Sequence, residues 1–342
     1  MLVSAQFLPQ PLDFANGVFH GSFIYNLTRN AGATTIASYR KTVLIYNPYA
    51  GRFRGKGEAL IARALDILRD DGHDAEARPT TGPGTAGDMA REAIAGGAGL
   101  ILAAGGDGTI NETAEGMLFS SVPLGILPAG TANVLATEMR LGRGWDRAVR
   151  RLAECDPHQV AVGRLTTAEK TRHFLLMAGA GLDAGIVYRV NAALKARTGK
   201  FAYWVAGWSL VGRALAEFRV CADGRETTCS FALASRVRNY GGDFEIARET
   251  TLFDDTFEVV LFEGRNSARY VKYFLGMALH RLSGMPGVTV LRTKELSLSR
   301  AHTQKVYIQI DGEFAGQLPA RIEIVPAALT LLIPPGYGGR KE

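Results

Sequence analysis

The sequence has little cysteine and no long apolar run, and each shortage excludes a class of protein. Its 342 residues include three cysteines, Cys155, Cys221 and Cys229, an odd number without metal-ligand spacing. That usage is typical of reduced thiols in a cytoplasm. The nearest approach to a membrane span is FAYWVAGWSLVG at 201–212, which is shorter than the roughly 18 residues that a spanning helix needs. The first 40 residues lack a basic start followed by an apolar stretch, so we expect no secretory signal.

Several catalytic motifs are also missing. The chain has no H-E-x-x-H, G-x-S-x-G or paired C-x-x-C, and its six histidines are scattered, so zinc chemistry and triad hydrolysis are not expected. GRFRGKG at 51–57 is one residue short of a P-loop between its glycines and ends in Gly57. GPGTAG at 82–87 has the form of a dinucleotide fingerprint, with Asp107 20 residues beyond it. This remains the weaker interpretation, because Asp107 belongs to a stronger motif.

What the chain does contain is typical of a folded globular protein. Hydrophobic residues make up 47% and charged residues 21%, which leaves ample material for a packed core. A length of 342 residues predicts two domains. The net charge of +6 favours an anionic partner such as a nucleotide, an acidic lipid surface or a nucleic acid. Charge alone does not choose among them.

From residue 41 to about 160 the chain repeats one pattern of strand, loop and helix. KTVLIY at 41–46 is a short apolar run, and EALIARALDILRDDG at 58–72 has apolar residues at helical spacing. Three more pairs of strand and helix follow. The repetition predicts a parallel sheet with helices on its faces, a three-layer α/β domain that binds ligands at the carboxyl ends of its strands. Residues 1–40 lack clear periodicity and are treated as an N-terminal extension.

The second half of the chain has a different sequence pattern. Helices are expected at about 183–216, followed by alternating segments with turn signals. Asp223-Gly224 and Asp311-Gly312 lie between strand-like runs, and Asp-Gly is a strong hairpin signal. We therefore expect a nucleotide-binding domain at 41–160 and a largely antiparallel β-sandwich domain at 161–335. The last segment could return to the first domain, and the active site should lie between the two.

The most informative stretch is Gly105-Gly106-Asp107-Gly108-Thr109, which follows an apolar strand. Thr109 is predicted to be the N-cap of the next helix, with Glu112 completing a capping box. The missing side chains at 105, 106 and 108 would let a phosphate approach the backbone, where N–H groups and the helix dipole stabilise negative charge. Asp107 would then be repelled unless it holds a cation such as Mg²⁺ or a positioned hydroxyl. The alternative is an ordinary glycine-rich turn.

Two neighbouring strand ends carry similar residues. YNPYAG places Asn47-Pro48 directly after a strand, and LPAGTAN places Gly130, Thr131 and Asn133 after another. Each could be an ordinary turn by itself. Together the three strand ends would form one polar floor for a nucleotide.

These residues carry a family resemblance. They are Asn47-Pro48-x-x-Gly51, Gly105-Gly106-Asp107-Gly108-Thr109-x-Asn111-Glu112, Pro128-x-Gly130-Thr131-x-Asn133, Gly179-x-Gly181-x-Asp183 and Asp311-Gly312-Glu313. In this order and spacing, over about residues 41 to 335, the chain resembles the diacylglycerol kinase catalytic-domain superfamily. Within it, the bacterial soluble lipid kinases are most similar, and sphingosine kinases are relatives.

The resemblance implies a kinase that transfers the γ-phosphoryl group of ATP to a lipid hydroxyl, most directly converting diacylglycerol to phosphatidic acid, with Mg²⁺. It implies Glu313 as the proton acceptor, with Asp311 as its support or a competing candidate, and Asp107 as a further catalytic residue. Its nucleotide-binding positions fall on Asn47, Pro48, Tyr49, Thr80, Gly105, Gly106, Asp107, Gly108, Thr109, Ile110, Asn111 and Thr131. We also predict nucleotide binding at Glu112, Gly130 and Asn133, which belong to the same strand-end segments.

A second implied feature is a Mg²⁺ site in the second domain. Its aspartate matches Asp254, and Thr251 and Thr256 could contribute backbone oxygens. The family usually has glycine after this aspartate, whereas this chain has Asp255. That departure puts the second-domain site in question.

The implied partners are ATP and a lipid alcohol at a membrane surface, which would make the protein cytoplasmic and peripheral at the inner face of the membrane. Segments 200–215 and 269–282 mix aromatic, apolar and basic residues, a pattern that suits either a bilayer interface or a core helix. No nucleic acid is expected, because no reader motif accompanies the basic residues at 140–151. The oligomeric state is open, with a dimer as one option. The alternatives are a sphingoid-base kinase, an NAD-type kinase and a nucleotide-binding regulator without turnover.

Overall fold

The computed structural model describes residues 39, 41–142, 144–182, 184–185, 215–241, 244–267, 269–278 and 281–338. The predicted extension at 1–40 and the helices expected at 183–216 therefore lie almost wholly outside the described residues, as does Asp183 of the family pattern. Within the described ranges, no helix is both long enough and apolar enough to cross a membrane.

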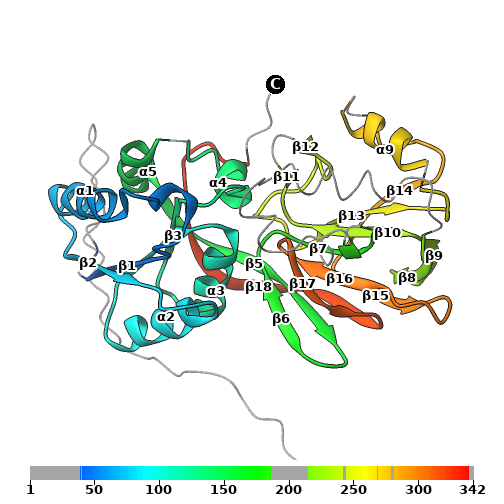
Figure 1. Ribbon diagram of the computed structural model, residues 1–342, viewed down its shortest axis with the longest axis horizontal. Coiled ribbons are helices and arrows are strands. Elements are labelled where there is room, and N and C mark those ends of the chain that lie inside the picture. Colours follow the sequence, from blue (N-terminus) through cyan, green and yellow to red (C-terminus); the bar gives the residue numbers. More distant parts are fainter. Residues whose placement is uncertain are drawn as a thin grey trace, which may run out of the picture. The chain divides into compact units, whose positions relative to one another are not determined.

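The first part of the described chain is a parallel α/β structure (Figure 1). Its four strands lie in the order β2-β1-β3-β4 and pair in parallel. They are β1 Thr42–Tyr46, β2 Ala75–Pro79, β3 Leu100–Gly105 and β4 Leu124–Pro128. The helices are α1 Gly57–Asp70, α2 Thr85–Ala95, α3 Asp107–Met117, α4 Val134–Glu138 and α5 Trp145–Arg151, with 3-10 turns at Gly51–Phe53 and Leu152–Glu154.

Side chains alternate between the two faces of the parallel sheet, and helices cover both faces. On one face, Leu44 and Leu102 pack with α1 and α5. On the other face, Val43, Ile45 and Ile101 pack with α2, α3 and α4. Successive side chains of a strand point to opposite faces, so a fully apolar strand needs cover on both. The predicted three-layer α/β domain is confirmed.

The second part is a β-sandwich, as predicted. One sheet has the antiparallel order β14-β13-β10-β7-β16-β17, and β15, β8 and β9 belong to the facing sheet. Aromatic and β-branched side chains such as Phe174, Phe257 and Ile308 fill the space between them. The strands are β6 Thr171–Phe174, β7 Met177–Gly181, β8 Phe218–Ala222, β9 Arg225–Cys229, β10 Phe231–Ser235, β11 Asn239–Gly241, β12 Phe244–Glu245, β13 Phe257–Phe262, β14 Val288–Thr293, β15 Glu295–Arg300, β16 Tyr307–Ile310 and β17 Glu313–Gln317, and the helix is α9 Arg269–Ala278.

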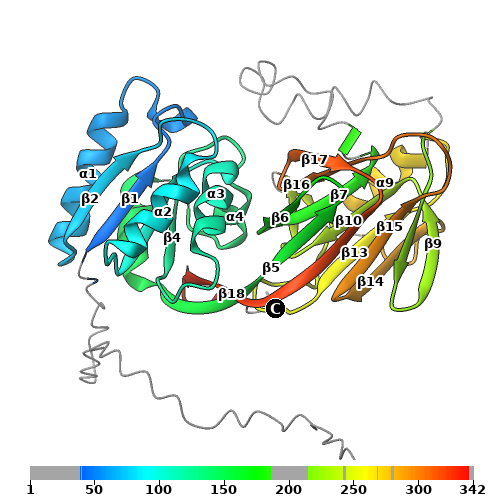
Figure 2. The same ribbon diagram turned by 90° about the horizontal axis from the view of Figure 1, so that it is seen from below.

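Two long strands join these parts. β5 (Asp156–Thr167) and β18 (Ala320–Ile333) pair antiparallel along their length, with a register shift between Val325 and Leu329. β18 pairs with β15 near its start and with β4, in parallel, near its end. One ten-stranded sheet therefore continues from the α/β part into the sandwich (Figure 2). The boundary expected near residue 160 falls inside β5.

Both Asp-Gly pairs form hairpin turns, as predicted. Asp223 and Gly224 have φ of 49° and 75° between β8 and β9, and Asp311 and Gly312 have φ of 49° and 79° between β16 and β17. Two successive positive φ values define the turn that matches strand twist, which favours Asp-Gly.

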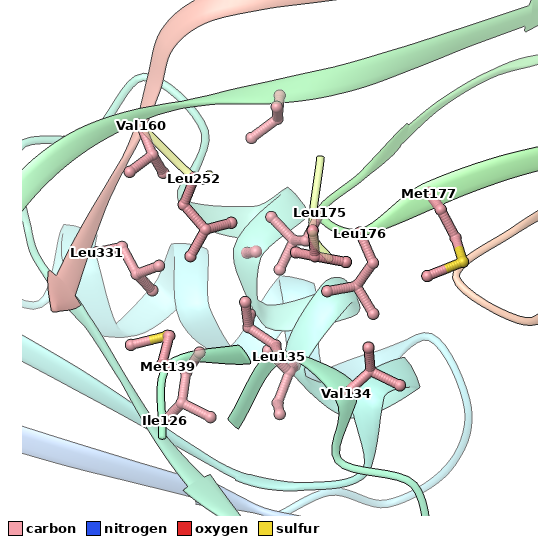
Figure 3. Packing of buried hydrophobic residues seen from close by; sticks show 14 of the residues in the cluster. Ile126, Val134, Leu135, Met139, Val160, Leu175, Leu176, Met177, Leu252 and Leu331 are labelled. Atoms are coloured by element: carbon pink, nitrogen blue, oxygen red, sulfur yellow. The ribbon is translucent and has the colours of Figure 1, made fainter. Parts of the chain in front are cut away.

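The two parts share an apolar cluster, which we call the junction cluster. Figure 3 shows Val134 and Leu135 of α4 lying opposite Leu175 and Leu176, which precede β7. Leu252 packs into the same cluster. Close packing at the junction fixes the chain after β4 against the chain before β7, because such cores deform little.

Candidate active site

The exit of β1 is tied to the exit of β3 and to α3. The backbone N–H of Asn47 donates to the Ala104 carbonyl at 3.0 Å. Its side-chain Nδ2 donates to Thr109 Oγ1 at 3.4 Å, and its Oδ1 accepts the N–H of Tyr49 at 2.9 Å. Asn47 thus shapes the loop that follows β1 and orients the first turn of α3.

The predicted cap of α3 is wrong. The helix begins at Asp107 with Gly106 as N-cap, so Thr109 lies inside the first turn and forms no capping box with Glu112. The Thr109 side chain instead packs onto Gly105, where an added Cβ would lie only 2.6 Å from Thr109 Cβ. The strand therefore turns directly into the helix, because Gly105 leaves the space that Thr109 fills.

The exits of β3 and β4 touch through glycine backbone. A Cβ on Gly130 would lie 2.4 Å from the Cα of Gly106. Asn133 closes the β4 turn, since its Oδ1 accepts the Gly130 N–H and its Nδ2 donates to the Gly130 carbonyl, both at 2.8 Å. The first N–H groups of a helix have no partner within it and lie at the positive end of its dipole. The start of α3 is therefore a bare backbone surface suited to an anion.

The remaining predicted nucleotide positions divide into two groups. Thr80 donates its N–H to the Tyr46 carbonyl at 2.8 Å, which places the end of β2 beside Asn47 and Pro48. The Tyr49 side chain is exposed, and Thr131 lies close to Gly51. Ile110 and Asn111 face inward. Ile110 is buried in the core, and the side chain of Asn111 donates to the His173 carbonyl of β6 at 3.2 Å.

Asp107 faces α4. Its Oδ1 accepts the N–H of Leu135 at 3.3 Å. Burial raises the pKa of Asp107, and backbone N–H groups at the start of α4 act in the opposite direction. The carboxylate therefore satisfies a helix N-terminus, a favourable position for negative charge, and in this structure it is engaged there.

Asp311 is engaged by backbone as well. Its Oδ2 accepts the N–H of Leu175, and its Oδ1 accepts those of Leu176 and Met177, all at 2.9 Å. Burial raises the pKa of Asp311 to about 6, and the negative charge of Asp107 adds to the effect. These contacts make Asp311 the support that anchors the β16–β17 turn to the start of β7.

Glu313 is the carboxylate that reaches the start of α3. Its Oε1 lies 2.8 Å from the position that a Cβ on Gly108 would take. Its Oε2 accepts from Arg172 Nη2 at 3.3 Å, and its side chain is 48% exposed. The fold thus brings an accessible carboxylate from the sandwich beside the start of α3 in the α/β part.

Two contributors were missed by sequence reasoning. Arg172, on β6, holds Glu313. Glu138, at the end of α4, is buried and accepts from the N–H and Nε of Arg238, from Asn239 and from the Tyr337 hydroxyl, at 3.0 to 3.2 Å. Neither stands at a fixed spacing from any motif, so the sequence carried no signal for them.

The residues of the expected second-domain metal site do come together, but around an arginine. Asp254 Oδ2 accepts from Thr251, through its N–H at 2.7 Å and its hydroxyl at 3.2 Å. Asp254 Oδ1 lies 3.0 Å from Arg292 Nη2. Both carboxylate oxygens of Asp254 therefore already have partners, and the Thr251 carbonyl accepts the N–H of Asp254 at 3.1 Å. As arranged, these residues do not fit a divalent cation.

Comparison with known proteins agrees with this architecture. Residues 41–165 match the diacylglycerol kinase catalytic domain, and residues 177–333 match the YegS C-terminal NAD kinase beta sandwich-like domain. The chain is 28% identical over 285 residues to the diacylglycerol kinase of Bacillus subtilis (strain 168), covering 82% of this chain and 92% of that one. It is 25% identical over 286 residues to the diacylglycerol kinase of Staphylococcus aureus (strain bovine RF122 / ET3-1), covering 82% and 88%.

Solved structures share the fold. A crystal structure of a diacylglycerol kinase from Bacillus anthracis str. Sterne aligns with a TM-score of 0.70 at 22% identity, over 87% of this chain and 98% of that one. Another structure from the same strain aligns with a TM-score of 0.76 at 20% identity, over 90% and 99%. The fold joins an α/β domain to a β-sandwich, and the relatives named diacylglycerol kinase support a kinase. The chain belongs to the diacylglycerol kinase catalytic-domain superfamily, as the sequence motifs predicted.

The substitution Gly108→Ala tests the approach of Glu313 to α3. The new Cβ would displace the flexible Glu313 side chain, whereas alanine favours a helix over glycine by up to about 1 kcal/mol. We expect kinase activity to fall by about tenfold to a hundredfold, with the free energy of unfolding unchanged or higher. Steady-state kinetics and urea unfolding measure both. Gly144→Ala is the control, because its Cβ would meet the nearest heavy atom at 3.6 Å. A fully active Gly108→Ala protein would contradict the placement of Glu313.

A second prediction concerns pH. The pKa of Asp311 is about 6 in the folded protein, against 3.8 ordinarily, so the native state holds this proton to higher pH than the unfolded chain does. Between about pH 4 and pH 6, Asp311 should therefore lower the free energy of unfolding as pH rises. The stability of wild type minus that of Asp311→Asn should shrink by about 2 to 3 kcal/mol over this range. Urea unfolding at several pH values measures the difference, and a constant difference would refute the shift.

Proposed function

We propose that this protein transfers the γ-phosphoryl group of ATP to the free hydroxyl of diacylglycerol, forming phosphatidic acid at a membrane surface. The observation that carries the proposal is the position of the Glu313 carboxylate beside Gly108, at the start of α3. The two domain matches and the relatives named diacylglycerol kinase support it.

The nucleotide would lie across the exits of β1, β3 and β4. Its phosphates would meet the backbone of Gly106 to Gly108, where missing side chains allow close approach and the helix N-terminus favours negative charge. Arg52 holds the neighbouring turn, since its N–H and Nε donate to the carbonyls of Ala129 and Pro128 at 3.0 Å. Asn47 and Thr80 would border the nucleotide on the β1 and β2 side.

Phosphoryl transfer depends mainly on positioning and charge neutralisation. The lipid hydroxyl oxygen would attack the γ-phosphorus as the bond to ADP breaks, and its proton would pass to Glu313. Arg172 would keep the Glu313 carboxylate in place, and Asp311 would hold the hairpin that presents it. Mg²⁺, when bound to the phosphates of ATP, would neutralise part of their charge.

The substrate class is supported by helix α9. Val271 and Leu275, one turn apart, are 50% and 61% exposed, while Tyr273 and Met277 face the core. Lys272 is exposed beside them. An apolar stripe flanked by a basic residue suits an anionic bilayer surface, which is where diacylglycerol resides.

The direct test uses radiolabelled ATP with Mg²⁺ and three acceptors: diacylglycerol in mixed micelles, sphingosine in mixed micelles, and NAD. We expect lipid-soluble label with diacylglycerol. Label in sphingosine or in NAD would assign the site to a different hydroxyl. Nucleotide binding without any labelled product would indicate a regulator and would refute the proposal.

Glu313→Gln should separate chemistry from binding. Removal of the proton acceptor should lower kcat by about 10² to 10⁴, with KM for ATP and the melting temperature little changed, because the side chain is exposed. Glu92→Gln, at another exposed glutamate, is the matched control and should retain full activity. A Glu313→Gln protein with wild-type kcat would exclude Glu313 as the base.

The double variant Val271→Asp, Leu275→Asp should weaken binding to vesicles of anionic phospholipid by at least about tenfold, because it replaces the apolar contact with charge. Sedimentation with vesicles measures this. Phe119→Asp, at an apolar residue of the α/β part that is 72% exposed, is the control. Activity on a water-soluble short-chain diacylglycerol should be unchanged in both the double variant and the control. Equal vesicle binding by both variants would argue against α9 as the contact surface.

A further inference from the structure

The loop Glu249–Thr256, which precedes β13, is held from outside by Arg292 of β14. The guanidinium donates to Thr256 Oγ1 through Nη2 at 2.9 Å and Nε at 3.2 Å. Its Nη1 donates to the Glu249 carbonyl at 3.2 Å, and its Nη2 lies 3.0 Å from Asp254 Oδ1. One planar cation therefore contacts a carboxylate, a hydroxyl and a carbonyl of the same loop, a set that suits a guanidinium fork.

A second arginine binds the same loop from inside. Arg236 follows β10 and is 1% exposed. Its Nη2 donates to the carbonyls of Leu252 and Asp254 at 3.1 and 3.4 Å. The oxygen atoms of the loop thus point at two guanidinium groups.

We propose that Arg292 occupies the place of a divalent cation in this loop, so that the loop is ordered without a metal. A Mg²⁺ ion needs oxygen ligands at about 2.0 to 2.1 Å in near-octahedral arrangement. Both carboxylate oxygens of Asp254 are already engaged, one by Thr251 and one by Arg292. A divalent cation at this carboxylate would also be repelled by the guanidinium beside it.

The loop matters to the rest of the molecule because it joins the junction cluster. The Leu252 side chain packs there (Figure 3). The Leu252 N–H donates to the Tyr337 hydroxyl at 3.0 Å, and that hydroxyl donates to Glu138 of α4 at 3.1 Å. A loop ordered by arginine therefore supports α4, where Asp107 is bound, without requiring bound metal.

The test is a melting temperature and does not depend on the kinase assignment. Wild-type protein should melt within about 1 °C of the same temperature in EDTA and in millimolar Mg²⁺. Arg292→Met should melt about 3 to 6 °C lower in EDTA, because Asp254 loses its counter-ion. Millimolar Mg²⁺ should restore part of the loss, and Asp254→Asn added to Arg292→Met should remove that response.

Two further variants sharpen the result. Arg292→Lys keeps the positive charge, so it should melt between wild type and Arg292→Met and show no Mg²⁺ response. Arg63→Met, which removes a comparably exposed ion pair with Asp146, should change the melting temperature little. The proposal is overturned if EDTA lowers the wild-type melting temperature, if Arg292→Met melts like wild type, or if Mg²⁺ fails to raise it.

Discussion

The three hydrogen bonds that Asp311 accepts from Leu175, Leu176 and Met177 determine where Glu313 lies. They fix the turn between β16 and β17 to the start of β7, and Glu313 is the first residue after that turn. The same three residues contribute their side chains to the junction cluster, opposite Leu135. One short segment therefore positions the proposed base through its backbone and packs against the α/β part through its side chains.

A second partly buried carboxylate, Asp107, borders this cluster. Asp107 binds the N–H of Leu135, so both acids act on backbone groups that border the same apolar core. Burial raises both pKa values, and the charge of Asp107 raises that of Asp311 further. Burial of these two carboxyl groups disfavours their ionised forms. A protein can tolerate such a cost where the group holds the backbone in a required geometry. Glu313, the residue we propose as the base, has a more accessible side chain that is 48% exposed.

Local patterns in the sequence predicted the elements, and three-dimensional contacts decided the roles. The apolar run before Gly105 and the two Asp-Gly pairs gave the strand and hairpins correctly, because periodicity and positive φ are local properties. The start of α3 was misplaced because Thr109 has a capping side chain but is used for packing on Gly105. Asp311 and Glu313 could not be separated by sequence, since their partners lie near residues 175 and 108.

Asp255, where the loop at 249–256 departs from the family pattern, contributes to the charge balance of that loop. The loop is bordered by two guanidinium groups, Arg236 and Arg292, and carries two adjacent carboxylates, Asp254 and Asp255. Burial lowers the pKa of Arg236 to about 10, while Tyr337, Asp255 and Asp254 act to raise it. A glycine at 255 would leave the buried cation with one carboxylate fewer nearby. Asp255 therefore fits a loop whose positive charge comes from arginine. With two guanidinium groups beside the loop, a second carboxylate is needed to balance the second positive charge.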